Sequence, residues 1–400
     1  MSAEPPRAGR IVALLCLAEA LSMTGFAAYP AFLPALRETW GMSGAEAGFI
    51  GGAFFFGYMV AVPFLSGITD RIDARGVFAF SCLLAAGGSI GFALLARGVE
   101  SAALFQAIAG AGLAGTYMPG LKALTDRVGG TRQARFIAFY TATFGIGTSV
   151  SLLAAGWLGA LLTWPTVFLL LALGPLLAAP AVFFGLGPQA PHGAGHAHWL
   201  PRFGPVLAEP ETRRFILGYS VHCWELFGLR SWMVAFIVFA FAAGQTTVPI
   251  NATEAAAAIN LLGLPASILG NEAAGRLGRL RWIAAIMAAS GLLCWLAGLS
   301  ATWPWWAMLG VLAIYFMTVM ADSAALTAGL VQATPLAQRG AAMAIYSLLG
   351  FGAGFVAPLV FGATLDAAGG SGSATAWTLA FGTLGAGGLW WAATARKSAN

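Results

Sequence analysis

Residues 136–185 read FIAFYTATFGIGTSVSLLAAGWLGALLTWPTVFLLLALGPLLAAPAVFFG and contain no Asp, Glu, Lys or Arg. An apolar α-helix needs about 20 residues to cross a bilayer core of ~30 Å, so this stretch has room for two crossings. The uncharged tract continues to residue 201, and residues 282–321 form a second tract with room for two crossings. The sequence therefore predicts a protein that crosses a membrane several times as α-helices.

The composition of the whole chain favours the same class. Of its 400 residues, 59% are hydrophobic and 9% are charged, whereas about a quarter of the residues of a soluble domain are charged. The mean hydropathy is +0.81. No ~10-residue segments of alternating hydrophobicity appear, which argues against a transmembrane barrel. The four cysteines lie in apolar stretches without a CxxC pair, so no disulfide framework is expected.

The apolar run that starts at Ile11 continues past Tyr29, too long for the 7–15-residue core of a signal peptide, and predicts a first membrane span. Division of the chain at charges, Pro/Gly clusters and polar runs gives twelve spans. They cover, approximately, residues 11–34, 47–68, 77–96, 102–121, 136–156, 164–185, 214–240, 254–273, 282–300, 305–329, 341–363 and 374–395. An even number of crossings places both termini on one side of the membrane.

Positive charges indicate which side is cytoplasmic. If the N-terminus and every second loop are cytoplasmic, seventeen of the twenty Lys and Arg residues lie on that side, Arg37 and Arg97 lie outside, and Arg230 lies within a span. We therefore predict a multi-pass protein of the plasma (inner) membrane with both termini in the cytoplasm. This topology explains the net charge of +5, and no nucleic-acid partner is expected.

The chain divides into two halves of six spans. A segment rich in Pro, Gly and His separates them, which predicts an N-terminal bundle at 1–185, a cytoplasmic linker at 186–213 and a C-terminal bundle at 214–400. The halves match weakly at a shift of 205–206 residues, which pairs Glu19 with Glu225 and Tyr140 with Tyr346. Parallel repeats of this kind, with the substrate site between them near mid-membrane, are typical of one class of secondary transporter.

The loop between spans 2 and 3 carries a recognisable motif. Residues 66–75 read SGITDRIDAR, and the matching loop of the second half, residues 271–281, reads NEAAGRLGRLR. With its twelve spans and central linker, the chain resembles the major facilitator superfamily, whose signature in this loop is G-x-L-x-D-R-x-G-R-[RK]. The resemblance implies a charge cluster that latches the two halves in one access state; alternatively, the arginines only set the topology. Its members here would be Asp70, Arg71, Arg75, Arg276 and Arg279.

Several positions depart from the patterns of this family. Asp73 stands where the signature has Gly, and Gly275 stands where the second copy would have its acid. Gln106 replaces the arginine of span 4, and span 5 lacks the GPxxGG pattern of many drug/proton antiporters. The interiors of spans 2 and 8 contain no arginine, unlike those of nitrate porters. These departures disfavour a standard multidrug exporter and a nitrate substrate.

Two carboxyl groups lie deep in the predicted membrane. At 1.5 Å per residue, Glu225 lies roughly 16 Å into span 7 and Glu19 lies about 13 Å into span 1. Acids at this depth face a cavity and serve function by default, and burial allows a carboxyl to bind and release a proton near neutral pH. We interpret both as proton-coupling residues of the substrate cavity. Alternatively, each stays protonated and only joins neighbouring helices.

Three further residues complete the predicted site. His222, one turn before Glu225, either orients that carboxyl and shares its proton, or bonds a backbone carbonyl. Arg230 lies about 24 Å into span 7 and either binds an anionic substrate or extends to the headgroups. Asp322 in span 10 either lines the cavity or pairs with a loop arginine.

These residues predict a secondary active transporter that moves a small solute by alternating access coupled to protons. Arg230 favours symport of a small organic anion into the cell. The alternative is a proton-driven exporter of a cationic or amphipathic compound, attracted by Glu19, Glu225 and Asp322. The expected partners are the small-molecule substrate, protons and the lipid bilayer, and the chain is expected to be a monomer.

The sequence contains few features that would support another class of function. An enzyme is not expected, because neither an H-E-x-x-H nor a G-x-S-x-G motif occurs, and no phosphate-binding G-x-x-x-x-G-K-[ST] loop supports ATP coupling. A sensor with transporter architecture is a further alternative. No cofactor is expected, and His192, His196 and His198 make a weak metal signature without Cys or acid nearby.

Overall fold

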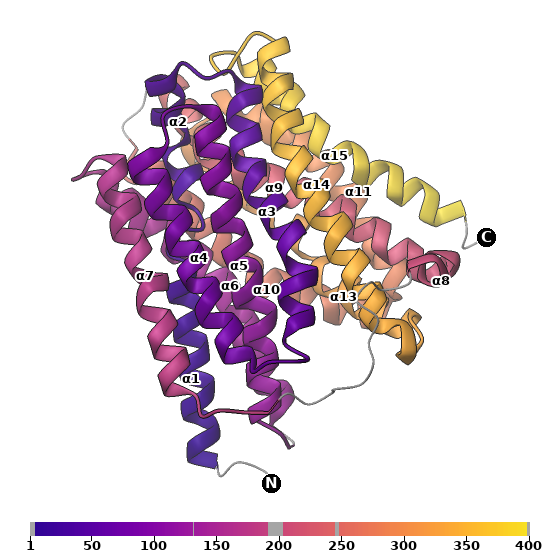
Figure 1. The fold of residues 1–400 in the computed structure, drawn as a ribbon. Coiled ribbons are helices and arrows are strands. Elements are labelled where there is room, and N and C mark those ends of the chain that lie inside the picture. Colours follow the sequence, from indigo (N-terminus) through magenta and orange to yellow (C-terminus); the bar gives the residue numbers. More distant parts are fainter. Residues whose placement is uncertain (1–4, 131, 191–202, 245–247, 398–400) are drawn as a thin grey trace. The chain divides into compact units, whose positions relative to one another are not determined.

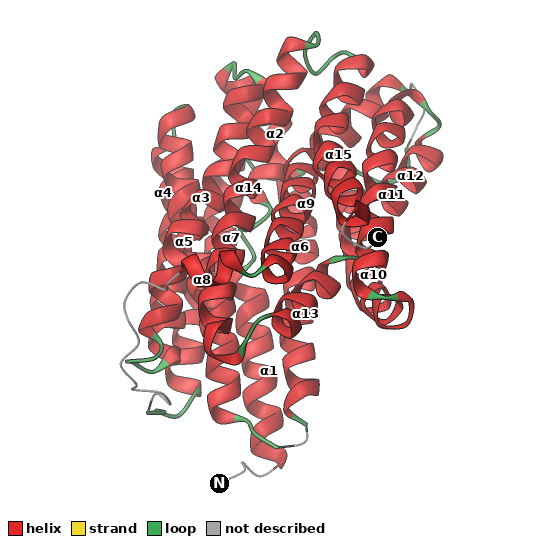
Figure 2. Cartoon of the chain, turned by 90° about the vertical axis from the view of Figure 1, so that its right-hand side faces the viewer, coloured by secondary structure: helices red, strands yellow, loops and turns green. Residues whose placement is uncertain are grey.

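The computed structural model describes residues 5–130, 132–190, 203–244 and 248–397 (Figure 1). This part of the chain is helical and contains no β-strand (Figure 2). The α-helices of its first half are α1 (Pro5–Ser22), α2 (Ala28–Trp40), α3 (Gly44–Ile68), α4 (Ala74–Leu95), α5 (Val99–Arg127), α6 (Gln133–Gly159) and α7 (Trp164–Gly185). Those of its second half are α8 (Phe203–Ala208), α9 (Pro210–Ala243), α10 (Ala252–Leu277), α11 (Arg279–Leu299), α12 (Trp305–Met320), α13 (Ser323–Ala333), α14 (Arg339–Ala367) and α15 (Ala374–Lys397). Two short 3₁₀ helices, η1 (Ser300–Thr302) and η2 (Leu336–Gln338), join them.

All twelve predicted spans are helical in this structure. Within the described residues, nine helical segments are long and apolar enough to cross a membrane: α3, α4, most of α6, α7, α9, α10, α11 with η1, α12 with α13, and α14. The three other predicted spans coincide with α1 and α2, α5, and α15. The prediction of an all-α, polytopic membrane protein is confirmed.

The chain packs as two compact units. The first consists of Met1–Phe32 with Ala53–Trp199, and the second of Leu33–Gly52 with Leu200–Asn400. The end of α2 and the start of α3 therefore pack with the second half of the chain. Buried residues of α1, α4, α5, α6 and α7 form a core in the first unit, and residues of α9, α11, α13, α14 and α15 form one in the second.

The first predicted span is broken between α1 and α2. Thr24 Oγ1 donates a hydrogen bond of 2.5 Å to Leu171 O, a carbonyl that lacks its usual helical donor because Pro175 has no N–H. Ser151 Oγ donates to Thr24 O at 2.6 Å and accepts from Ala27 N at 2.9 Å. Hydroxyl groups of neighbouring helices thus satisfy the backbone that the break exposes, which an apolar environment requires.

The tenth predicted span is also broken, at Ala321 and Asp322 between α12 and α13. Trp282 Nε1 donates to Ala321 O at 3.2 Å. A Cβ atom at Gly270 of α10 would lie 2.0 Å from the same carbonyl, so only glycine allows this approach. The Asp322 side chain does not cap α13, which leaves its carboxylate for another partner.

Within the second unit, the first turns of α3 pack closely on α14. A Cβ atom at Gly48 would lie 2.0 Å from Pro358 O, so a glycine is required there. At the end of α14, the two carboxylate oxygens of Asp366 accept hydrogen bonds from Gly44 N and Ala45 N at 2.7 and 2.8 Å. The carboxylate therefore satisfies the first amides of α3, where the helix dipole also favours negative charge.

Candidate functional site

Glu19 lies at the centre of a polar cluster in the first unit. Its side chain on α1 is fully buried, and Tyr140 Oη of α6 donates to Glu19 Oε2 at 3.2 Å. Ser22 Oγ lies 3.5 Å from the same oxygen and 3.3 Å from Thr116 Oγ1 of α5. Among the residues that the structure describes, Glu19 Oε1 has no hydrogen-bond partner and no cation pairs with the carboxyl.

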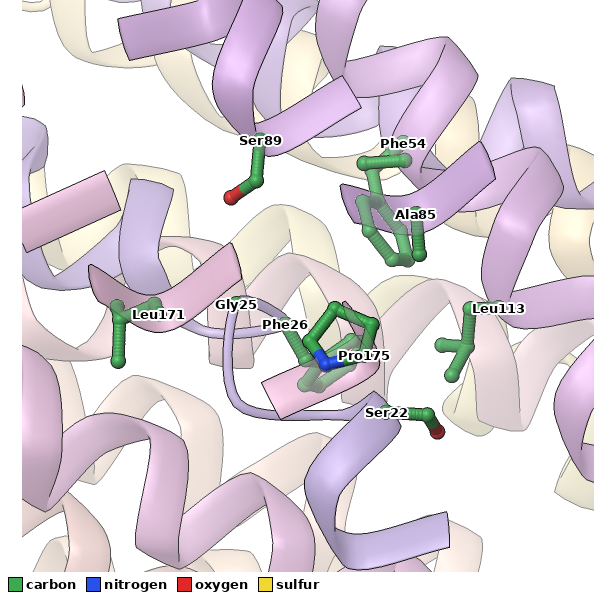
Figure 3. A pocket seen from close by; sticks show the side chains of 10 residues that line it. Ser22, Gly25, Phe26, Phe54, Ala85, Ser89, Leu113, Leu171 and Pro175 are labelled. Atoms are coloured by element: carbon green, nitrogen blue, oxygen red, sulfur yellow. The ribbon is translucent and has the colours of Figure 1, made fainter. Parts of the chain in front are cut away.

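A small cavity adjoins this cluster and the break between α1 and α2 (Figure 3). Its volume of about 20 Å³ has room for about one water molecule. Ser22 and Ser89 contribute its two hydroxyl groups, from α1 and α4. The other lining residues are Gly25, Phe26, Phe54, Ala85, Ala109, Leu113, Leu171 and Pro175. Ser22 contacts both Glu19 and the cavity, so it connects the buried carboxyl with this space.

Glu225 lies in a separate cluster in the second unit. The residue is 2% exposed on α9, and Ser290 Oγ of α11 donates to Glu225 Oε2 at 2.9 Å. Tyr315 of α12 lies close enough for its hydroxyl to interact with the carboxyl. Within the described chain, Glu225 Oε1 and Tyr315 Oη make no hydrogen bond of good geometry, and no cation pairs with Glu225. Both matching positions of the internal repeat thus hold a buried carboxyl without a cation partner among the described residues.

His222 contacts Asp322 and not Glu225. Its Nδ1 lies 2.7 Å from Asp322 Oδ1, and both side chains are almost fully buried. The break between α12 and α13 makes this contact possible, because the carboxylate is not used as a helix cap. Tyr219 stacks on His222 and on Tyr346, with ring centroids 5.8 and 3.7 Å apart. The structure thus brings His222 and Asp322 together, a pairing that the sequence analysis did not predict, and the roles expected of the two residues stay predictions.

Arg230 lies among α9, α10 and α12. Its Nε donates to Asn260 Oδ1 of α10 at 3.0 Å, and its guanidinium carbon lies 5.6 Å from the centroid of the Phe316 ring. No acidic side chain pairs with Arg230 in the described part of the chain. The side chain thus packs against helices of its own unit, with a neutral amide as its hydrogen-bond partner.

In the loop between α3 and α4, the structure places Asp73 at the centre of the charge cluster. Arg127 Nη2 donates to its two oxygens at 2.7 and 2.9 Å, Gln189 N donates at 2.8 Å, and Arg75 Nε lies at 3.1 Å. Burial acts to raise the pKa of Asp73, but the hydrogen bonds from Arg127 and from the Arg75 and Gln189 amides outweigh it and lower the pKa below its ordinary value. Asp73 also caps the start of α4.

The predicted latch residues of the first copy surround this centre. Asp70 is 53% exposed and lies 3.9 Å from Lys122 Nζ, and Arg71 is exposed. Arg75 Nη1 donates to Leu186 O at 2.8 Å, which ties the start of α4 to the end of α7. The cluster therefore joins α4, α5 and α7 within the first unit.

In the second copy of the loop, the described contacts of Arg279 are to neutral oxygen atoms. Arg279 Nη1 donates to Asn271 Oδ1 at 3.0 Å and to Ala325 O at 3.2 Å, while Arg276 is exposed. Gly278 joins α10 to α11 with φ of 92°, a conformation that suits glycine. Arg279 is thus bound by the neutral oxygen atoms of Asn271 and Ala325. Gly275 stands where the family signature has its acid.

Sequence reasoning did not assign roles to Asp73, Arg127 and Asn260. Asp73 carried a usable signal, because an Asp directly before a helix is a typical cap. Asn260 did too, as a polar side chain inside an apolar span. Their partners come from distant helices, so the contacts themselves had no signal. The three linker histidines lie outside the described residues, within which no group of three His, Cys, Asp or Glu residues could hold a metal.

Comparisons with known proteins agree with this architecture. Two solved structures of a bacterial homolog of the human lysosomal transporter Spinster are similar to the chain. Its inward-facing, unoccupied form aligns with a TM-score of 0.77 and 15% identity over 98% of this chain and 96% of that chain. The inward-facing, occupied form aligns with a TM-score of 0.72 and 16% identity over 99% and 96%. At these identities the likeness shows the fold alone. No curated protein sequence matches.

The family follows from a sequence comparison. A family model of the Major Facilitator Superfamily matches residues 15–255, which is more than half of the chain. The match includes α1 with Glu19, the loop with Asp73 and the part of α9 with Glu225 and Arg230. Together with the fold, it shows a multi-pass membrane protein of a secondary-transporter family and confirms the resemblance stated above. The chain belongs to the Major Facilitator Superfamily.

Proposed function

We propose that the chain is a proton-coupled symporter that imports a small organic anion across the plasma (inner) membrane, with both termini in the cytoplasm. The observation that carries this proposal is the environment of Arg230. It is a cation inside a membrane-spanning helix, and its contacts within the described residues are a neutral amide and an aromatic ring.

A charge in this position needs compensation. Ionised groups inside a membrane are costly unless they pair with an opposite charge or reach water. The two buried acids of the second unit have other partners: Glu225 on α9 bonds Ser290, and Asp322, between α12 and α13, contacts His222. A substrate anion would supply the missing counter-charge and would bind best while Arg230 stays unpaired. A cationic substrate would be repelled by the same group.

Glu19 and Glu225 are the proton carriers in this proposal. Both are buried, hydrogen-bonded to hydroxyl groups and without a cation partner in the described chain. Desolvation disfavours the charged form of such a group. In this proposal each acid therefore binds a proton before the cavity around it closes to water. Symport of one proton with one monovalent anion moves no net charge. The His222–Asp322 pair, one turn from Glu225, offers a further place for a proton.

The loop residues have a separate role in the proposal. Asp70, Arg71, Arg75, Arg276 and Arg279 belong to the two copies of the loop that latches one access state, and Asp73 and Arg127 form its anchor in the first copy. The bundle 1–185, the linker 186–213 and the bundle 214–400 are its moving parts.

The unpaired carboxyls also favour a second candidate, a proton-driven exporter of a cationic compound. In that mechanism Glu19 or Glu225 would pair with the cation after it releases a proton. The sign of the ligand charge and the direction of the pH effect separate the two functions, because protonation strengthens anion binding and weakens cation binding.

The test is a thermal-stability screen of the purified protein in detergent at pH 5.5 and 7.5. The ligands are acetate, benzoate, succinate, inorganic phosphate, amines, sugars and lipophilic cations. A ligand that binds only the folded state stabilises it by about 2.7 kcal/mol at 100 times its Kd. We expect a carboxylate to raise Tm, more strongly at pH 5.5. We also expect an inward proton gradient to drive uptake of this carboxylate into proteoliposomes.

Two arginine variants sharpen the screen. Arg230→Gln removes the proposed anion partner, and Arg97→Gln removes the same charge at the end of α4, where the side chain bonds Leu94 O and Ala96 O. We expect loss of the carboxylate response in the first variant only. A lipophilic cation that raises Tm more strongly at pH 7.5 would overturn the anion proposal and favour the exporter.

A further inference from the structure

Asn260 of α10 is a polar side chain whose environment calls for an explanation. It is 3% exposed and lies in the middle of an apolar segment, AAAAINLLGLP (255–265). A buried amide is costly unless its donors and acceptor are bonded. The hydrogen bonds of Asn260 therefore indicate why this position carries an amide.

Its contacts fix the orientation of the amide. Nδ2 donates to Ala256 O of its own helix at 2.9 Å and lies 3.8 Å from Met233 Sδ. Oδ1 accepts from Arg230 Nε at 3.0 Å. A flipped amide would place NH₂ against the Arg230 N–H and oxygen against the Ala256 carbonyl, with both contacts repulsive. The oxygen of Asn260 is thus held toward Arg230.

The same contacts leave one edge of the guanidinium unused. Asn260 takes Nε, and the ring of Phe316, which is fully buried, lies over the guanidinium. In the described part of the chain, Nη1 and Nη2 of Arg230 make no hydrogen bond or ion pair. Two parallel N–H groups at the end of an arginine match the two oxygens of one carboxylate.

We propose that Asn260 is a positioning residue for the substrate. It holds Arg230 by Nε so that Nη1 and Nη2 bind the two oxygens of a carboxylate end-on. Because the amide is neutral, it orients the arginine without cancelling its charge. This inference rests on the proposed function and deepens it: the substrate class is a small carboxylate, bound through both oxygens.

Two substitutions at Asn260 test the two parts of this role. Asn260→Asp keeps the shape but gives Arg230 a permanent counter-ion. We expect the apparent Kd for the best carboxylate to weaken at least 30-fold, while Tm without ligand stays at or above that of the unchanged protein. Asn260→Leu keeps the charge of Arg230 but removes the hydrogen bond that fixes the orientation of its guanidinium group. We expect KM for uptake to rise about tenfold with the maximal rate within about twofold, which a merely structural defect would not produce.

The matched control is Asn251→Asp, the same substitution at the start of the same helix. Asn251 caps α10 through Glu254 N, and Asp caps as well as Asn. This variant should bind and transport like the unchanged protein. Benzamide, which has the shape of benzoate but no charge and one oxygen, should not raise Tm, and inorganic phosphate should raise it less than benzoate.

The outcomes separate the two proposals. If the unchanged protein responds to carboxylates and Asn260→Asp responds equally, Asn260 does not position Arg230, and the anion function stands. The inference also fails if Asn260→Leu lowers the maximal rate with KM unchanged. If the unchanged protein binds no carboxylate but responds to cations, the proposed function fails, and this inference fails with it.

Discussion

Glu19 and Glu225 occupy matching positions of the two halves, yet they contact different partners. Glu19 bonds Tyr140 of α6 and lies beside Ser22. At the same shift, Tyr140 corresponds to Tyr346, but Tyr346 bonds Thr327 and stacks on Tyr219. Glu225 instead bonds Ser290 of α11. The repeat has kept the buried acid and changed its surroundings.

The second difference concerns charge. At a shift of 206 residues, His222 and Asp322 correspond to Cys16 and Thr116. The second unit therefore carries a buried His–Asp contact, whose histidine lies one turn before Glu225, where the first unit has a thiol and a hydroxyl. The two matching acids therefore have different polar neighbours within the described residues.

The largest expected effect comes from breaking the His222–Asp322 contact of the second unit. Asp322→Asn keeps a hydrogen-bond acceptor but removes the negative charge that a protonated His222 pairs with. Loss of that charge should lower the free energy of unfolding by about 3–5 kcal/mol. Thr116→Val, at the matching position of the first unit, should cost about 1 kcal/mol because it removes neutral hydrogen bonds. Chemical unfolding in detergent measures both.

A double variant provides the control for this result. His222→Cys with Asp322→Thr gives the second unit the residues of the first and leaves no unpaired charge. It should recover most of the stability that Asp322→Asn loses. Equal losses for Asp322→Asn and Thr116→Val would show that the His222–Asp322 contact joins neutral groups.

The charge cluster of the first unit should make stability depend on pH. The folded-state pKa of Asp73 is lowered, so its contribution is present above the unfolded value of about 3.9 and is lost as pH falls through the folded value. Asp73→Asn should cost about 2 kcal/mol at pH 7, typical of hydrogen bonds to charged groups. The same variant should no longer lose this stability contribution below pH 4, which measurements of Tm over a series of acidic pH values would check.

The second loop gives the matched comparison. Arg279 is held by neutral oxygens, so Asn271→Ala should alter stability by the same amount at pH 7 and at pH 4. A pH-dependent effect of Asn271→Ala, or none for Asp73→Asn, would contradict the assignment of acid sensitivity to the first loop.

Proton coupling should depend on both acids. An inward gradient of one pH unit supplies about 1.4 kcal/mol, so a one-proton symporter accumulates its anion about tenfold. Glu19→Gln and Glu225→Gln keep the shape of the side chain, and each should reduce this accumulation toward equality while exchange of labelled substrate continues. Uptake in proteoliposomes with and without the gradient measures it. Full accumulation in either variant would remove that acid from the mechanism.

The smallest effect separates the two tyrosines. Tyr140→Phe removes the hydroxyl beside Glu19, and Tyr346→Phe removes the one that bonds Thr327; each should cost about 1 kcal/mol. Only Tyr140→Phe should move the pH profile of transport, since Tyr140 donates a hydrogen bond to the Glu19 carboxyl, whereas Tyr346 is hydrogen-bonded to Thr327. A pH profile moved equally by both would show that the profile reports general destabilisation.

Much of the fold was predictable because a membrane imposes a simple length rule. The uncharged tract 136–185 became α6 and α7, and the lengths of the other spans followed in the same way. The two breaks were not predicted. They depend on hydrogen-bonding groups that neighbouring helices supply, such as the Ser151 hydroxyl beside α2 and the Trp282 indole N–H beside α13. No local pattern encodes such partners.

The candidate site likewise has features that the sequence predicted and features that only the packing of the helices set. The sequence alone determined the helical membrane class. It also determined that Glu19, His222, Glu225, Arg230 and Asp322 lie in apolar runs, because an ionisable residue in such a run is visible without coordinates. The tertiary structure decided their partners: His222 with Asp322, Arg230 with Asn260, and Asp73 with Arg127. Each pairing joins residues 30 to 100 positions apart, and the packing of helices, which depends on every side chain between them, sets which ones meet.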